Sequence, residues 1–320
     1  MREQNEAKPV APNATKAGDK HMNKSIIAGL TLTCLVSGPL SAEPANYATP
    51  QDAVEAMMAA LVATDREAVM TVFGAESADF LSSGNDREDR QNSESILGMY
   101  SEGFRMVPQE DGSVVLTLGV NGWPFPIPIE RSDDRWTFDV EAGREEVLAR
   151  EIGLNELEII DLLEAYVDIQ AAYRLVDHDG DGVMEFARQI ISSSATARDG
   201  LFWPAPDSPL GELFARASVD GFNDGEQDFE PEPYSGYYFR ILTEQTAMAP
   251  GGEMNYLVND NMVGGHAILA VPANFGETGI TSFMVSENGI VLETVLGEET
   301  LEIAAPMIAY DPTPEWSPAE

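Results

Sequence analysis

Twice along this chain, the spacing of apolar residues changes from a helical period to a strand period, and this change constrains the fold more than any other feature. Residues 54–61 and 159–173 are apolar along one face of a helix. Residues 114–120 and 237–295 instead contain short segments rich in strand-forming residues. Helices followed by neighbouring strands favour α+β proteins. We therefore predict two α+β domains, each with helices followed by an antiparallel β-meander.

The first predicted domain covers residues 46–152. Thr49 precedes a proline and an acidic first turn, which is typical of a helix N-terminus, and a second short helix is expected to begin near Asp65. Prolines at 124, 126 and 128 remove every ladder donor on one side of residues 123–129. That segment is therefore expected to be an edge strand or a polyproline segment.

The layout of this first domain resembles the curved-sheet, cone-shaped domains of the NTF-two-like type. The resemblance implies a pocket enclosed by helices and sheet, which hosts small-molecule binding or acid/base catalysis. The candidate pocket residues are Trp123, Trp136, Asp139 and Arg144. We prefer the alternative in which the aromatic residues form core and the Asp and Arg are solvated, because large aromatic side chains usually serve burial.

The second predicted domain covers residues 153–312, and we interpret residues 313–320 as a tail. Asn155 and Glu158 have the spacing of a helix-capping pair, so we expect a helix to begin there. Strand-forming segments then predict a meander, whose last two strands are joined through Asn288 and the glycine that follows it.

An acidic segment directly after that helix, residues 177–185, is the one local motif with specific chemistry. We call it the aspartate loop. Its candidate calcium ligands are Asp177, Asp179, Asp181, the Val183 carbonyl and Glu185. Oxygen ligands at this spacing, with a glycine at the sixth position, suit Ca²⁺. Arg188 stands where an EF-hand has its bidentate glutamate, which argues against a true EF-hand. We expect a structural calcium ion, and the alternative is an Asx-turn satisfied by its own backbone.

The N-terminal part of the chain has the pattern of a secretory signal peptide. An apolar run at residues 26–36 precedes a small-residue site that ends at Ala42. We interpret residues 22–42 as the signal and residues 1–21 as an unstructured upstream extension. Lipid attachment at Cys34 is a disfavoured alternative, because the preceding residues lack the usual pattern. The expected location is periplasmic or extracellular, with no membrane span after cleavage.

Beyond residue 42 the composition is extremely acidic. This part has neither cysteine nor lysine, and its 52 acidic residues against 13 arginines give a net charge of −39. Such a charge repels nucleic acids and anionic membranes. We interpret it as adaptation to a salty habitat, because about 1 M salt shortens the Debye length to about 3 Å and screens self-repulsion. Without cysteine, the fold depends on burial and on any bound metal rather than on disulfides.

Several segments together carry a family resemblance. They are Trp123-Pro-Phe-Pro-Ile-Pro, Trp136-Thr-Phe-Asp, the Asp-His-Asp-Gly-Asp-Gly run of the aspartate loop, Asp199-Gly-Leu-Phe-Trp-Pro and Gly236-Tyr-Tyr-Phe-Arg-Ile-Leu. The chain resembles the bacterial domain-of-unknown-function 2950 family, which implies an exported protein and no established activity. The second domain also resembles the globular part of type IV pilin-like proteins. A polar stretch before Asn155 argues against pilin-type filament assembly.

No motif for catalysis stands out. His178 and His266 are the histidines beyond residue 42, and we expect His178 to be solvated. The chain has no nucleophile elbow, His-x-x-x-His zinc motif, phosphate loop or dinucleotide fingerprint, so no catalytic residue is predicted. The favoured hypothesis is a non-catalytic envelope protein, a calcium-stabilised binding or assembly module with an unknown protein partner. The alternative is a small-ligand-binding or hydrolytic protein that uses a pocket in the first domain.

Overall fold

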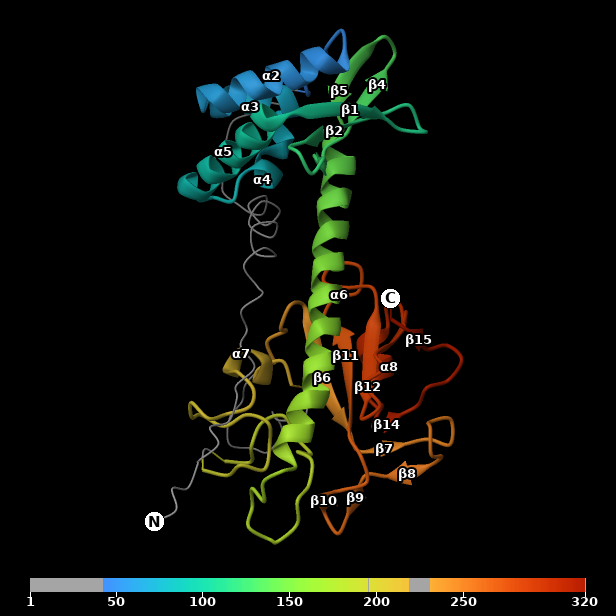
Figure 1. The fold of residues 1–320 in the computed structure, drawn as a ribbon. Helices are drawn as coiled ribbons and strands as arrows, with labels where there is room; N and C mark the ends of the chain where they lie inside the picture. The colour runs from blue at the N-terminus through green and yellow to red at the C-terminus, as the bar shows by residue number, and fades with distance from the viewer. Residues whose placement is uncertain (1–42, 195, 219–230, 320) are drawn as a thin grey trace. The chain divides into compact units, whose positions relative to one another are not determined.

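The computed structural model describes residues 43–194, 196–218 and 231–319. The predicted upstream extension and signal peptide lie outside the described residues. The chain divides into two compact units, the first ending at Glu151 and the second beginning at Ile152, and each is described by itself (Figure 1). Among the described residues, no helix combines the length and the apolar character needed to cross a membrane.

Helices form the N-terminal part of the first unit. They are α2 (Pro50–Ala63), α3 (Arg66–Phe73), the 3-10 turn η1 (Ala75–Ser77), α4 (Ala78–Leu81) and α5 (Asp86–Glu102). The start of α2 is a capping box, because Thr49 Oγ1 accepts the Asp52 N–H and the Asp52 carboxylate accepts the Thr49 N–H, each at 3.1 Å. Asp65 caps α3 by accepting the N–H groups of Glu67 and Ala68 with its carboxylate, so both predicted helix starts are present.

An antiparallel sheet completes the first unit. Its strands are β1 (Phe104–Pro108), β2 (Val114–Leu118), β3 (Trp123–Pro124), β4 (Ile129–Ser132) and β5 (Arg135–Phe138), in the order β1-β2-β4-β5, with β3 paired to β2. Strand β2 buries alternate residues, as its sequence predicts. The strand does not continue to Val120, which is exposed, because Gly119 and Gly122 turn the chain at φ +71° and +65°.

Helix α6 (Val140–Tyr173) is the main departure from the predicted layout. The expected helix start at Asn155 is wrong, because α6 runs unbroken for 34 residues and passes through that position. Asp139 instead caps the helix, with its carboxylate accepting the Ala142 N–H at 3.0 Å. The Asn155 side chain donates to the carbonyl oxygen of Thr278 at 3.1 Å. Its polar group therefore serves a tertiary contact rather than a cap.

The second unit combines the C-terminal part of α6 with short helices and strands. These are α7 (Glu212–Ala215), β6 (Tyr237–Leu242), β7 (Glu244–Gln245), β8 (Met254–Asn255), β9 (Leu257–Val258), β10 (Asn261–Met262), β11 (Ala267–Pro272), β12 (Ser282–Ser286), β13 (Leu292–Thr294), α8 (Thr300–Ala304), β14 (Ala309–Tyr310) and β15 (Ser317–Pro318). The main sheet has the order β15-β13-β12-β11-β6 and is antiparallel throughout. Strand β15 comes from residues 313–320, so the predicted tail belongs to the sheet.

The core of the second unit lies where α6 meets this sheet. Ile159, Leu163 and Tyr166 of α6 are fully buried, and every residue of β11 and β12 is buried as well. The described chain therefore combines helices with mainly antiparallel sheets, and the α+β prediction is confirmed. The burial of a helix stripe against alternating and continuous apolar strands accounts for this architecture.

Candidate functional site

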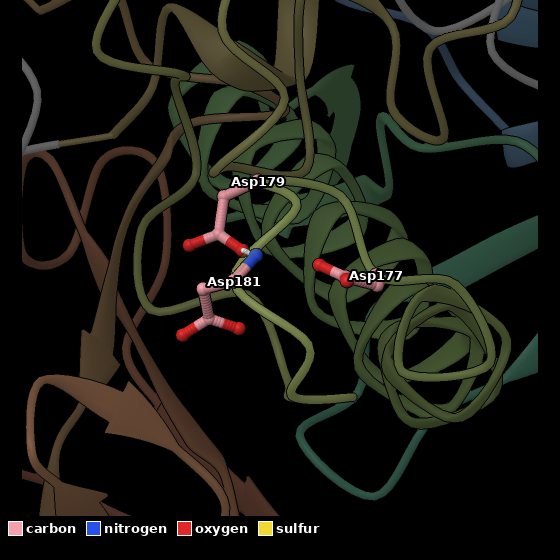
Figure 2. A group of neighbouring side chains, drawn as sticks. All are labelled: Asp177, Asp179 and Asp181. Atoms are coloured by element: carbon pink, nitrogen blue, oxygen red, sulfur yellow. Dashed lines mark hydrogen bonds between the residues drawn. The ribbon is translucent and has the colours of Figure 1, made fainter.

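The aspartate loop begins shortly after the end of α6 at Tyr173 and gathers three carboxylates (Figure 2). Asp177, Asp179 and Asp181 each offer a carboxylate oxygen, and these oxygens lie within 4.8 Å of one another. The backbone reverses within six residues because Gly180 and Gly182 adopt φ of +80° and +90°, a region that a β-carbon disfavours. The arrangement brings hard oxygen donors together on an exposed surface of the second unit.

Backbone N–H groups of the loop already bind these carboxylates. Asp177 accepts from Gly180 at 2.8 Å and from Gly182 at 2.9 Å, and Asp181 accepts from the Val183 N–H at 2.7 Å. The bond from Gly180 is the main cause that holds the pKa of Asp177 below its ordinary value. Carboxylate oxygens keep further lone pairs. The geometry is therefore compatible with both interpretations of the sequence, the preformed calcium loop and the self-satisfied turn.

Two hydrogen bonds connect the loop to the hairpin of β9 and β10. Asn261 Nδ2 donates to Asp181 Oδ2 at 2.6 Å, and Glu185 Oε2 accepts the Met262 N–H at 2.8 Å. Burial raises the pKa of Glu185 most, the Met262 bond lowers it, and the charges of Asp179 and Asp181 raise it further. A divalent cation at this position would oppose that repulsion.

Neither histidine has the environment of an open surface residue. His178 is half-buried, contrary to the expectation of a solvated ring, and stacks on Tyr173 with ring centroids 4.0 Å apart. His266 is only 1% exposed, lies between the rings of Tyr166 and Phe186, and has no hydrogen-bond partner at Nδ1. Burial is the main cause that lowers the pKa of His266 to about 4, so its ring is neutral at pH 7.

A cavity of about 340 Å³ lies in the first unit, between α2, α3, α5 and the segment that follows β3. Its volume falls within the range of small-molecule pockets. The apolar wall includes Met57, Leu61, Phe73, Ile96, Phe125 and Ile127. The rings of Phe73 and Phe125 both pack on Phe138, with centroids 4.7 and 6.3 Å from it, so the floor of the cavity is continuous with the core of the unit.

The structure brings only part of the predicted pocket together. Trp123 lines the cavity, whereas Trp136, Asp139 and Arg144 are not among the lining residues. Trp136 belongs to strand β5, and Asp139 caps α6. Arg144 donates to the Asp79 carboxylate at 2.6 Å and so fastens α6 to α4. Asp139 and Arg144 therefore have structural partners, whereas the preferred interpretation had both side chains solvated.

Sequence reasoning missed the contribution of α5 to this cavity. Asp89, Arg90, Asn92, Ser93 and Ile96 all line it, although the helix has no fully buried residue. An available signal was Ile96, the first apolar residue of the helix after the polar run at residues 86–95. Such a residue indicates a face that is turned toward something other than open solvent.

The described molecule is thus an α+β protein with an acidic, glycine-shaped loop in one unit and an apolar cavity in the other. The sequence profile of the family described as "Protein of unknown function (DUF2950)" matches residues 45–319, and the chain belongs to this family. Comparisons with curated proteins and with solved structures find no match. The pilin-like and NTF-two-like resemblances accordingly rest on sequence pattern alone.

Proposed function

We propose that this protein is an exported, calcium-stabilised binding module, and that its second unit presents the interaction surface to a protein of the cell envelope. The convergence of three carboxylates on the aspartate loop is the observation that carries this proposal. Export is proposed from the signal-peptide pattern of residues 22–42. The periplasm and the extracellular medium both have the calcium supply that such a loop requires.

The proposed ion takes oxygen ligands from the three aspartates, the Val183 carbonyl and Glu185. Calcium accepts 6–8 oxygen ligands in flexible geometry, so water molecules complete the shell. Arg188 stands where an EF-hand has its bidentate glutamate, so the loop has one strong ligand fewer. We therefore expect a weak calcium affinity like that of extracellular calcium-binding modules, with a Kd of about 10⁻⁴ to 10⁻³ M. Such an ion has a structural role, because its ligands Asp181 and Glu185 also bind the β9–β10 hairpin.

The proposed interaction surface surrounds this loop and hairpin. Leu175 and Met184 are 71% and 58% exposed at the two ends of the loop region. Val258 in β9 and Val263, which follows β10, are 50% and 37% exposed. Exposed apolar side chains beside a cation-ordered loop suit a protein partner. Nucleic acid is a poor partner for a chain with a net charge of −37.

Thermal melting tests the proposal. The purified protein is melted at high NaCl, first with EDTA and then with Ca²⁺ at about 100 times the dissociation constant, which should add about 2.7 kcal/mol to the free energy of unfolding. Mg²⁺ at equal concentration controls for general screening of the acidic surface. Equal melting temperatures in EDTA and Ca²⁺ would leave the loop as a self-satisfied turn.

A second candidate function is small-ligand binding by the first unit. The cavity of about 340 Å³ with its apolar wall supports it. Trp123 lines the cavity, so its fluorescence should change when a ligand binds there. It is one of four tryptophans in the chain, so a variant without it is needed to assign the change. A change of emission that saturates with a small apolar probe, and that Trp123→Phe removes, supports this function; absence of any saturable change counts against it.

A further inference from the structure

We propose that the first-unit cavity binds a small aliphatic carboxylate, with the aliphatic body against the apolar wall and the anionic group beside Arg66 and Arg90. This inference rests on the second candidate function and names its ligand class. It combines the size of the cavity, the apolar character of its wall and the charges at its rim.

The size of the cavity limits the occupant. Water occupies about 30 Å³ per molecule in the liquid. By that measure, the cavity volume of about 340 Å³ accommodates a ligand of about ten non-hydrogen atoms. An unbranched acid of about eight to ten carbons has this size. Longer acyl chains would have to leave part of their length in solvent.

The wall of the cavity suits an aliphatic chain rather than a sugar or nucleotide. Helices α2 and α3 contribute Met57, Leu61 and Met70, and the segment after β3 contributes Phe125 and Ile127. Leu61 and Met70 line the cavity and are only partly buried. An aliphatic ligand that covers this apolar surface removes it from water, which favours binding.

Two arginines that line the cavity offer cationic partners to the ligand's polar group. Arg66 begins α3 and Arg90 lies in α5, and both line the cavity with exposed side chains. Within the described part of the chain, neither guanidinium group has an ion pair or a side-chain hydrogen bond. Six other arginines do pair with carboxylates, at positions 131, 144, 150, 174, 198 and 216. Two unpaired cations therefore line the same cavity, in a protein that is otherwise rich in anions.

Three aspartates share the rim, and two of them already have donors. Asp65 accepts the N–H groups of Glu67 and Ala68 at 3.0 and 3.2 Å. The Asp89 carboxylate accepts hydrogen bonds from the Ser82 hydroxyl at 2.7 Å, the Ser83 N–H at 2.8 Å and the Ser83 hydroxyl at 2.7 Å. These bonds stabilise the carboxylates within the local structure.

The third rim aspartate, Asp86, is exposed at the first position of α5, where the helix dipole favours a negative charge. Asn92 also lines the cavity and offers a neutral amide donor. Arginine and amide donors suit a carboxylate. A singly charged group is favoured over a phosphate dianion, because the strongly negative protein repels the second charge.

Isothermal titration with decanoate tests the inference, with decylamine and 1-decanol as probes of matched chain length. We expect decanoate to bind more tightly than either 1-decanol or decylamine, because its anionic group alone can pair with the two guanidinium groups. Arg66→Gln and Arg90→Gln should each weaken decanoate binding by about tenfold and leave 1-decanol unchanged. Arg87→Gln is the matched control, since Arg87 is an exposed residue of the same helix that does not line the cavity.

The outcomes distinguish failure of the carboxylate inference from failure of the second candidate function, small-ligand binding by the first unit. If 1-decanol or decylamine binds as tightly as decanoate, or if the two variants bind decanoate normally, the cavity is a ligand site but the carboxylate class is wrong. If none of the three probes binds, the carboxylate inference and the second candidate function both fail. The variants change exposed side chains, and their melting temperatures verify that the fold is retained.

Discussion

The side-chain amide of Asn261 donates a hydrogen bond of 2.6 Å to the carboxylate of Asp181, which joins two segments 80 residues apart. Through this bond, the state of the aspartate loop is linked to the position of the β9–β10 hairpin. A second bond, from the Met262 N–H to Glu185, acts in parallel. The acidic loop is therefore part of the tertiary structure of the second unit, and not merely a solvated turn after a helix.

Asn261→Asp should make this link depend on calcium. The substitution places a second carboxylate where the amide now donates to Asp181, so like charges meet without a cation. We expect lower stability than the parent in EDTA, by about 1 kcal/mol or more because a donor is lost as well. In Ca²⁺ the new carboxylate can serve as a ligand, so the calcium-induced rise in melting temperature should exceed that of the parent. An equal or smaller rise would contradict a cation beside Asp181.

Asp179→Asn should remove most of the calcium effect. The amide has the size of the carboxylate but lacks its charge, so the loop should fold in EDTA and lose affinity for the cation. Asp168→Asn is the matched control, because Asp168 is an exposed aspartate of α6 outside the loop. Melting curves of both variants in EDTA and in Ca²⁺ make the comparison. A calcium shift that survives in Asp179→Asn would exclude this carboxylate as a ligand.

His266 should make the second unit sensitive to acid. Its pKa is lowered to about 4 in the fold, against about 6.5 for an unfolded chain. Between these values the unfolded state binds more protons, so stability present above pH 6.5 is lost as pH falls toward 4. Each pKa unit corresponds to about 1.4 kcal/mol, so the full loss is about 3 kcal/mol.

The variant His266→Gln removes this titration. Denaturant unfolding between pH 7 and pH 4, at high salt to screen the surface carboxylates, should show a shallower loss of stability in the variant than in the parent. The two proteins should differ mainly in the slope between about pH 6.5 and 4. If the free energy of unfolding changed with pH in the same way in both proteins, the fold would not disfavour protonation of the His266 ring.

Two glycines of α6 should respond in opposite directions to alanine. A β-carbon at Gly143 would lie 2.7 Å from Ile127 Cγ1 and 3.2 Å from its Cα, so Gly143→Ala must displace a wall residue of the cavity. At Gly153 no atom lies within 4 Å, so Gly153→Ala should gain about 1 kcal/mol from helix propensity. Chemical denaturation measures both. Equal stabilisation by the two substitutions would contradict the close approach at Gly143.

Local sequence signals predicted those parts of the fold whose causes are local. The helix start at Thr49 was predictable because a hydroxyl cap, a proline and an acidic residue act within four positions. The carboxylates of the aspartate loop were predictable as a group because five residues of chain contain all three. Asn155 carried an equally clear local signal and was misinterpreted, since its amide binds Thr278, more than a hundred residues away.

The cavity was less predictable because its wall is assembled from separate elements. Trp123 was one of the candidate pocket residues and lines the cavity, yet the rim depends on Arg66 and Arg90, which come from two different helices. Nothing in the spacing of these arginines along the chain indicates that they share a rim. They line one cavity because α3 and α5 both pack against α2, which a pattern of apolar residues does not specify.

Equilibrium dialysis with radioactive calcium tests the central claim most directly. The full chain and Asp179→Asn are dialysed side by side at high NaCl, with free Ca²⁺ rising through about 10⁻⁴ to 10⁻³ M. The account predicts one saturable ion per parent chain above the level bound by the variant. Equal binding by the two proteins at every concentration would contradict it, because the acidic surface would then hold calcium only as a diffuse counterion.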